Sequence, residues 1–361
     1  MDLPELKIGR FVAKVPIVQG GMGVGISLSS LAGNVALNGG IGVISAVEIG
    51  FNEQDYLTNK MEANLRALRA HIKKARDIAR GGVLGINIMA VLNSFEQIVV
   101  EAVKQRIDII FSGAGLPLKL PQFTIGTDTK IVPIVSSHRA AAAICKNWHR
   151  HYGVVPDAIV VEGPLAGGHL GFKEGDIMQP SFHLHQLLKN VIEVIKPFEA
   201  IYKKKIPVIA AGGIFSGEDI AEVIHLGASG VQMATRFVAT HECDASEEFK
   251  QAYINAGHDD VQIIQSPVGM IGRAIKNKFL TDVAAGQKKP IRCLCNCLKP
   301  CNPAKSPYCI ADALINAQRG NLDKGFAFAG ANVYKITKIV SVKNLMNELV
   351  SEAKRHLNVH N

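Results

Sequence analysis

Short β-branched, apolar runs alternate with longer segments of helical character through the first two-thirds of the chain, and this alternation restricts the fold more than any other feature. The candidate strands are Pro16–Gln19, Ile41–Ser45, Val83–Met89, Ile107–Phe111, Ile131–Val135, Asp157–Val161, Ile206–Ala210 and Gly230–Met233. The helical segments are Ser27–Leu37, Gln54–Arg80, Ser94–Lys104, His138–Arg150, Phe182–Tyr202 and Gly217–Leu226. Continuously apolar strands joined by helices are typical of a parallel sheet covered on both faces. Eight such units predict an α/β fold, the (β/α)8 TIM barrel.

The connections and the end of the chain refine this picture. The Pro-rich connection Gly115–Gln122 predicts only a loop or short turn. Beyond Thr240, Ser246–Ala256 and Ala311–Arg319 have helical character, whereas Gln262–Gly272 reads as irregular. The segment Val342–Leu357 is an amphipathic helix, which we expect to close the barrel wall. We therefore expect a barrel, an inserted substrate-side elaboration and a closing helix at residues 1–240, 241–338 and 339–361.

Composition excludes several classes of protein. The formal charge is +9, but the basic residues are dispersed or lie on helical faces without interleaved aromatic residues, so we expect no nucleic-acid partner. No uninterrupted apolar stretch reaches about 18 residues, so we expect no membrane span. The first residues lack the pattern of a signal peptide, and seven cysteines, an odd number, favour a reducing compartment. We expect a cytoplasmic protein.

Small and polar residues follow nearly every candidate strand. They include Gln19–Gly23, Asn87, Ser112–Gly115, Ser136–His138, Gly167–His169, Ala211–Ile214 and Ala234–Phe237. The active site of a barrel gathers the residues that follow its strands, so these segments predict one shared pocket. Within it, the Gly-Gly-His segment combines close backbone approach with an imidazole that exchanges a proton near neutral pH.

The last two strand ends predict a phosphate site. Ala211–Ile214 is followed by Ser216–Asp219, which resembles the head of a helix, where backbone N–H groups and the helix dipole favour an anion. Met233–Arg236 follows the eighth strand, and barrels frequently hold a phosphate between these two loops. Tight turns needed only for packing are the alternative. The spaced glycines of Gly20–Gly25 suit a flat ring better than a dinucleotide, and Asn87 and Ser136 or Ser137 could hydrogen-bond around it.

Four blocks resemble the nitronate monooxygenase (2-nitropropane dioxygenase) family of FMN-dependent barrels, which also contains the flavin-type enoyl-acyl-carrier-protein reductases. The blocks are Pro16–Gly23, Glu162–His169, Ala210–Ile214 and Leu226–Phe237. The resemblance covers nearly the whole chain and implies that His169 is the catalytic residue. It also implies FMN contacts at Gly20, Gly21, Met22, Asn87, Ser136, Gly167, Gly168, Ala211, Gly213, Ala234 and Thr235.

The resemblance implies oxidation of alkyl nitronates by FMN and O₂ to carbonyl compounds and nitrite. His169 would be the general base toward a neutral nitroalkane, and would orient or hydrogen-bond a preformed nitronate. Two alternatives stay open: an NADH-dependent flavin reductase of enoyl thioesters or quinones, and a non-catalytic barrel that binds a phosphate ligand. The oligomeric state is also open, with a homodimer as one expectation.

Two features depart from the family. Its members often have a lysine after the fifth strand, whereas Ser136-Ser137-His138 stands here. The second feature is the cysteine-rich segment Cys293–Cys309, which includes Cys295 and Cys297. Clustered cysteines can bind zinc or an iron–sulfur cluster. Because the alternating spacing is not that of a standard zinc site, we expect no metal, and instead a reduced, turn-rich segment near the pocket mouth.

Overall fold

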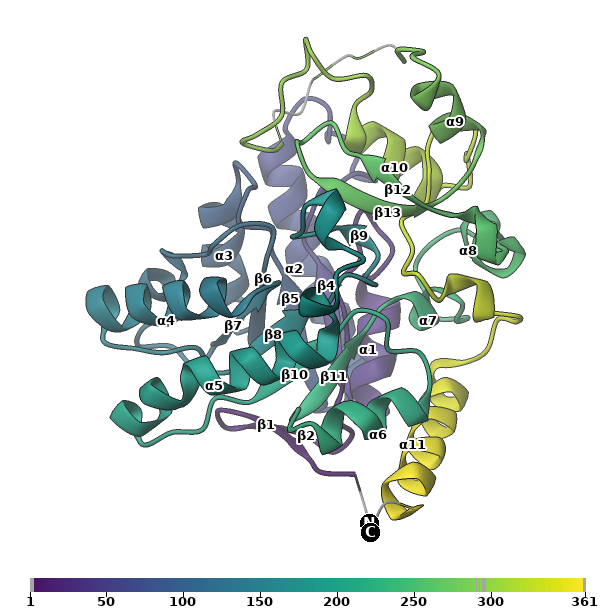
Figure 1. Cartoon of the computed structure of the whole chain (residues 1–361). Helices are drawn as coiled ribbons and strands as arrows, with labels where there is room; N and C mark the ends of the chain where they lie inside the picture. The colour runs from purple at the N-terminus through teal and green to yellow at the C-terminus, as the bar shows by residue number, and fades with distance from the viewer. Residues whose placement is uncertain (1–2, 290, 292, 294–296, 360–361) are drawn as a thin grey trace.

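The computed structural model describes residues 3–289, 291, 293 and 297–359. Its centre is a closed barrel of parallel strands in the order β10-β11-β3-β4-β5-β6-β7-β8 (Figure 1). Their bounds are Ile17–Gln19 (β3), Ile41–Ser45 (β4), Val83–Asn87 (β5), Ile109–Ser112 (β6), Lys130–Val135 (β7), Ile159–Glu162 (β8), Val208–Ala211 (β10) and Gly230–Met233 (β11). The predicted (β/α)8 barrel is confirmed.

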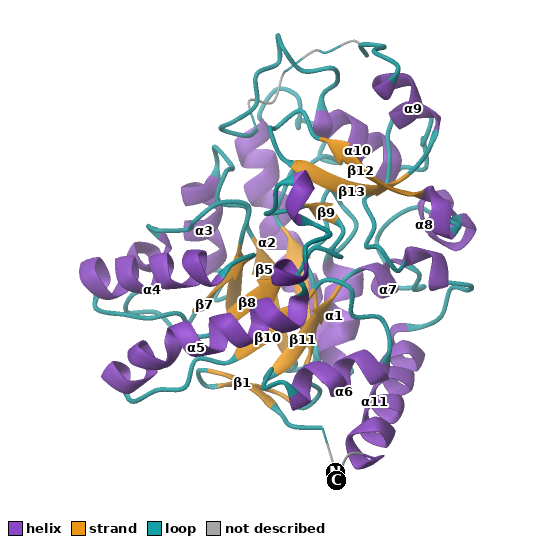
Figure 2. Ribbon diagram, in the orientation of Figure 1, coloured by secondary structure: helices purple, strands orange, loops and turns teal. Residues whose placement is uncertain are grey.

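Helices surround this barrel (Figure 2). Those that follow the strands are α1 (Ser29–Leu37), α2 (Lys60–Ala79), α3 (Phe95–Lys104), α4 (His138–Tyr152), α5 (Leu184–Tyr202) and α6 (Gly217–His225). Only the short 3₁₀ helix Leu120–Phe123 lies between β6 and β7, as the Pro-rich connection predicts. The length and apolar character needed to cross a membrane are combined in none of the helices of the described chain.

Three strands, β6, β8 and β10, begin two residues later than the apolar runs predict, and an aspartate stands just before each of the first two. The carboxylate of Asp108 accepts the N–H of Leu84 at 2.8 Å, and that of Asp157 accepts the N–H of Ile131 at 3.0 Å. Each carboxylate therefore hydrogen-bonds the backbone of a neighbouring strand segment at the amino-terminal edge of the barrel. Asp108 and Asp157 thus contact the neighbouring strand through their side chains but lie outside the strands β6 and β8.

A hairpin closes this amino-terminal end. The strands β1 (Leu6–Ile8) and β2 (Phe11–Ala13) pair antiparallel, and Figure 1 places them at the end of the barrel opposite α9 and α10. Leu6 and Ile8 are fully buried in one cluster with the inward-facing residues of the barrel strands. The interior of the barrel at this end is therefore filled with apolar side chains.

The short helix α7 (Thr235–Val238) follows β11, and the elaboration after it covers the carboxyl end. The elements of the elaboration are α8 (Glu247–Asn255), β12 (Val261–Gln265), β13 (Ile271–Ile275), α9 (Lys278–Ala284) and α10 (Ile310–Gln318). The expectation that Gln262–Gly272 is irregular is wrong, because β12 and β13 form a hairpin. Its partner is the two-residue strand β9 (Gly168–His169), which pairs with β13 at Gly272 and Arg273. This pairing joins segments about a hundred residues apart, and local sequence patterns do not encode it.

The last helix, α11 (Val342–Val359), packs against α6 and α1 on the barrel wall. These two helices follow β10 and β3, the neighbours of β11, so α11 occupies the helix position that belongs to β11. The crossing with α6 is close because of Gly217, where a Cβ would stand 2.4 Å from the backbone nitrogen of Ala353. The N–H of Gly217 also donates to the Glu352 carboxylate at 2.7 Å.

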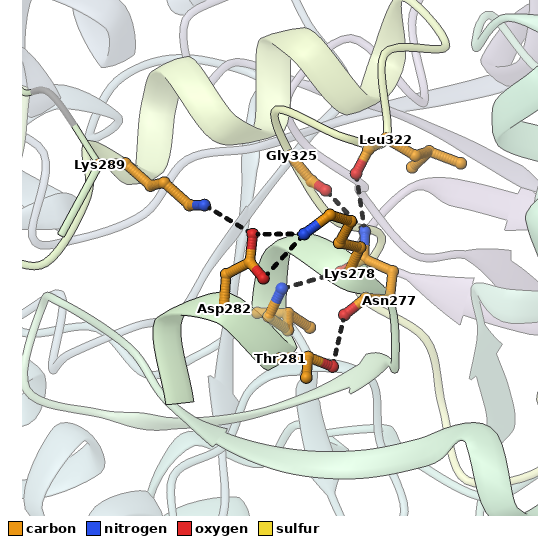
Figure 3. Close-up of polar contacts among 8 residues, drawn as sticks. Asn277, Lys278, Thr281, Asp282, Lys289, Leu322 and Gly325 are labelled. Atoms are coloured by element: carbon orange, nitrogen blue, oxygen red, sulfur yellow. Dashed lines mark hydrogen bonds and ion pairs between the residues drawn. The ribbon is translucent and has the colours of Figure 1, made fainter. Parts of the chain in front are cut away.

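Asn277 joins two parts of the elaboration (Figure 3). Its side-chain oxygen accepts the N–H of Leu280 at 3.0 Å and caps α9. Its amide nitrogen donates to the carbonyls of Leu322 at 2.9 Å and Gly325 at 2.7 Å. Residues 322–325 lead to Phe328, which lines the cavity described below. One polar side chain therefore holds both a helix start and the segment that carries a cavity residue.

Replacement Asn277→Ala is expected to lower the free energy of unfolding by about 2–3 kcal/mol, because a helix cap is lost and two carbonyls lose their donor. Urea denaturation measures the change. Lys278→Ala is the control, because Lys278 is exposed and its ion pair with Asp282 contributes little. Equal losses in the two variants would contradict the role assigned to Asn277.

Candidate active site

A cavity of about 450 Å³ opens among the loops at the carboxyl ends of the barrel strands. Every site residue predicted from the sequence lines it: Gly20, Gly21, Met22, Asn87, Ser136, Gly167, Gly168, His169, Ala211, Gly213, Ala234 and Thr235. The Gly-Gly-His and Gly212–Gly213 segments therefore face one space. Their predicted roles as cofactor contacts and catalytic base are taken up under the proposed function.

The loop between β8 and β9 is held by a side chain from the elaboration. Arg273 of β13 is buried, and its Nη1 donates to the carbonyl oxygens of Pro164 and Ala166. Gly168 follows with φ of +80°, a conformation that favours glycine. Apart from its chain neighbours, no described residue has an atom within 4 Å of where its Cβ would stand. The backbone before the histidine is thus fixed, and Gly168 borders open cavity.

His169 is positioned by the β12–β13 hairpin. Its Nε2 lies 2.7 Å from the hydroxyl oxygen of Ser266, and its ring centroid lies 5.1 Å from that of Phe328. Burial disfavours the charged imidazolium and lowers the pKa of His169 to about 4. At neutral pH the ring is therefore uncharged and has one nitrogen able to accept a proton.

Sequence reasoning missed Ser266. The segment Ser266–Gly269 carries the Pro and Gly of a tight turn, which could have indicated the hairpin. Nothing local could have paired its hydroxyl with an imidazole about a hundred positions earlier. The contact follows from the alignment of β9 with β13, where His169 lies opposite Gly272.

The predicted phosphate site differs from expectation in one respect. The first N–H groups at the head of α6 are already used: Asp219 accepts those of Phe215 and Ser216, and Glu352 accepts that of Gly217. Ser216 and Asp219 form a reciprocal capping box. These N–H groups are therefore not available to a phosphate. The backbone N–H groups that could bind one lie earlier in the chain, in the glycine turn.

The glycine turn retains unused donors. Gly212 and Gly213 have φ of +90° and +95°, and the described chain contains no acceptor for the N–H groups of Gly212, Gly213 or Ile214. Across the turn, the hydroxyl of Thr235 accepts the N–H of Gly330 at 3.0 Å. Successive free amides in such a turn form a concavity that suits an anion.

The residues after β3, β5 and β7 form another part of the cavity wall, and two of these segments lie in close contact. A Cβ on Gly21 would stand 2.3 Å from the Cβ of Asn87, so glycine is needed where the loops after β3 and β5 touch. Both serines after β7, Ser136 and Ser137, line the cavity. The hydroxyl of Ser137 also accepts the N–H of Ala140 and caps α4, so that hydroxyl already has a partner.

Two carboxyl groups to which the sequence analysis gave no role also line the cavity. Glu162 ends β8, and burial raises its pKa to about 7. Glu48 is buried with φ of +50°; its carboxylate accepts the hydroxyl of Tyr56 and pairs with Lys60 at 2.7 Å. Among the described residues that line the cavity there is no lysine or arginine. Apart from the carboxyl groups of Glu48 and Glu162, the described side chains that line the cavity are therefore uncharged at neutral pH.

The described part of the cysteine-rich segment packs at this cavity. Cys297 and Leu298 line it, and Leu298 forms an antiparallel bridge with Leu92 after β5. Cys295 lies outside the described residues. Across residues 3–289, 291, 293 and 297–359, no three His, Cys, Asp or Glu side chains are grouped so that they could hold a metal ion.

Comparison with known proteins agrees with this site. The sequence model of the nitronate monooxygenase family matches residues 5–352. A probable nitronate monooxygenase of Staphylococcus aureus is 26% identical over 303 residues, covering 74% of this chain and 77% of that protein. FabK from Thermotoga maritima superposes with a TM-score of 0.75 at 25% identity, covering 96% of this chain and 94% of FabK.

The fold is also shared with nitroalkane oxidase from Streptomyces ansochromogenes, at a TM-score of 0.73 and 20% identity over 96% of this chain and 98% of that one. The family match extends over nearly the whole chain and includes every strand of the barrel and each segment that lines the cavity. The chain belongs to the nitronate monooxygenase family and is an oxidoreductase.

Proposed function

We propose that the protein uses FMN and O₂ to oxidise alkyl nitronates to carbonyl compounds and nitrite. The observation that carries the proposal is that an uncharged His169 and the free amides of Gly212–Ile214 line one cavity. The first suits proton transfer or hydrogen bonding to a substrate, and the second suits a phosphate. Membership of the nitronate monooxygenase family supports the same reaction.

The residues present fit FMN. The amides of Gly212, Gly213 and Ile214 would hold its phosphate together with the loop at Ala234 and Thr235. The remaining predicted contacts line the same cavity: Gly20, Gly21, Met22, Asn87, Ser136, Gly167, Gly168 and Ala211. When bound, FMN supplies the electron transfer, and the protein supplies position and electrostatics.

His169 would act on the substrate directly. In the tautomer whose Nε2–H donates to Ser266, Nδ1 is the nitrogen left to accept the proton from the α-carbon of a neutral nitroalkane. Toward a preformed nitronate, the same ring orients or hydrogen-bonds the anion. Phe328 and the surrounding β12–β13 hairpin shield the ring from water and keep it uncharged.

The cavity favours this reaction over an NADH-dependent reductase. A nicotinamide dinucleotide carries a pyrophosphate, which proteins usually bind with arginine, lysine or several backbone amides. The described lining has no lysine or arginine, and its free glycine-turn amides are assigned to the phosphate of FMN. A second phosphate group has no evident partner.

Anaerobic mixing of the purified protein with ethyl nitronate and with NADH, each in turn, tests the proposal. We expect a yellow protein whose flavin absorbance is bleached by the nitronate and not by NADH. Rapid bleaching by NADH alone would support the reductase. A colourless protein that takes up no FMN would overturn the proposal.

Replacement Ser266→Ala is expected to lower kcat for a neutral nitroalkane by about 2- to 10-fold, the worth of one hydrogen bond, because His169 loses its orienting partner. Steady-state kinetics measures the change, and flavin content should stay constant. Ser266→Thr retains a hydroxyl and should recover most of the activity. A Ser266→Ala enzyme with unchanged kcat would exclude this role.

A further inference from the structure

The cavity wall that the elaboration contributes is apolar. The residues that it contributes include Tyr253, Leu298, Ile310, Ala311, Leu314 and Phe328. The hydroxyl of Tyr253 is already used, because it donates to the carbonyl of Phe328. None of these residues is acidic, basic or histidine. This wall offers a ligand mainly apolar surface.

The apolar wall has a defined helical component. Ile310, Ala311 and Leu314 recur at the spacing that places residues on one face of a helix, so α10 turns this face to the cavity. Across from it, the barrel loops contribute Leu116 and Leu165 to the lining, and these side chains are 46% and 44% exposed. Large apolar side chains that remain exposed therefore line the cavity.

Among the described residues that line the cavity, the side chains that can carry a charge near neutral pH are two carboxyl groups and the imidazole of His169. Glu48 and Glu162 are carboxyl groups, Lys60 already neutralises Glu48, and the described lining offers no lysine or arginine. His169 is placed for a single nitro group. A second negative charge on a ligand would be removed from water without a cationic partner, which is costly.

We propose that the substrate is a nitronate with an uncharged alkyl chain that packs on the wall formed by α10, Leu298 and Phe328, and that nitronates with a terminal carboxylate are rejected. This inference rests on the proposed function and specifies its substrate class. Each methylene buried on the wall should strengthen binding by about fourfold until the cavity is filled.

The test compares kcat/KM of the flavin-loaded enzyme for ethyl, propyl, butyl and hexyl nitronates and for propionate 3-nitronate. We expect a rise of about two- to fourfold per methylene. We also expect kcat/KM for propionate 3-nitronate to be at least about tenfold lower than kcat/KM for propyl nitronate. Equal kcat/KM across the alkyl series, or a preference for the carboxylate, would overturn the inference. Failure of every nitronate to bleach the flavin would instead overturn the proposed function.

A charge introduced on the wall gives a second test. Leu314→Lys should raise the ratio of kcat/KM for propionate 3-nitronate to that for propyl nitronate by about tenfold or more, because the carboxylate gains a partner. Asn316→Lys is the matched control, since it adds the same charge to α10 outside the cavity lining and should leave the ratio unchanged. Equal ratios in both variants would contradict the placement of the chain. The wild-type series decides the question if Leu314→Lys does not fold.

Discussion

The His169→Asn enzyme is expected to turn over a neutral nitroalkane about 10²–10⁴-fold more slowly than the wild type, the usual contribution of a general base. Asparagine retains a hydrogen-bonding side chain in the buried position but cannot accept the proton. A preformed nitronate has already lost that proton, so its oxidation should fall much less. Steady-state rates of nitrite release with the two substrate forms measure the difference.

Flavin content is the control for this variant. The amides assigned to the phosphate of FMN lie at Gly212–Ile214, on a different loop from His169, so absorbance should show wild-type occupancy. Loss of the flavin, or full activity on the neutral substrate, would show that His169 is not the base.

The pH profile gives an independent measure of the same residue. Burial lowers the pKa of His169 to about 4, from the value of 6.5 for an exposed imidazole. The reactive form is the neutral one, which is populated above the pKa and lost as pH falls through it. The acid limb of kcat/KM for a neutral nitroalkane should therefore lie near pH 4 and be absent in His169→Asn. An acid limb of kcat/KM near pH 6.5 would instead show that the imidazole of His169 is exposed to solvent.

The second large effect is expected at Gly168. Replacement Gly168→Val should weaken FMN binding by at least about tenfold, or 1.4 kcal/mol, because its side chain would project into the cavity. Apart from the chain neighbours, the described residues have no atom within 4 Å of the Cβ position, so the new side chain enters the cavity. Titration of the flavin-free protein with FMN, followed by fluorescence, measures the change.

Gly153 provides the matched control. It has φ of +65°, has no atom within 4 Å of its Cβ position, and ends α4 outside the cavity lining. Gly153→Val therefore carries the same kind of backbone strain, about 1–3 kcal/mol, without entering the site. It should lose stability and retain FMN affinity. Equal loss of affinity in both variants would mean that strain, and not occupation of the cavity, causes the effect at Gly168.

Local sequence was sufficient for the barrel and for the residues at its carboxyl rim. Parallel strands in a barrel end at one edge, so the residues after β3, β5, β7, β8, β10 and β11 had to meet once the strands were recognised. Gly21 and Asn87 illustrate this, since their loops touch although they lie far apart in the chain. The start of a helix is harder to interpret from sequence. The segment Ser216–Asp219 predicts an anion site, whereas in the structure the side chains of Ser216 and Asp219 hydrogen-bond each other's backbone.

The tertiary structure alone decided what faces His169 and what covers the cavity. Ser266 reaches the imidazole through the pairing of β9 with β13, and α10 presents Leu314 to the cavity from more than a hundred residues beyond β9. Periodicity and turn residues report on neighbours along the chain, whereas these contacts depend on how the elaboration packs over the barrel. The sequence therefore determined the barrel and its rim, and the packing of the elaboration determined the uncharged histidine and the apolar wall.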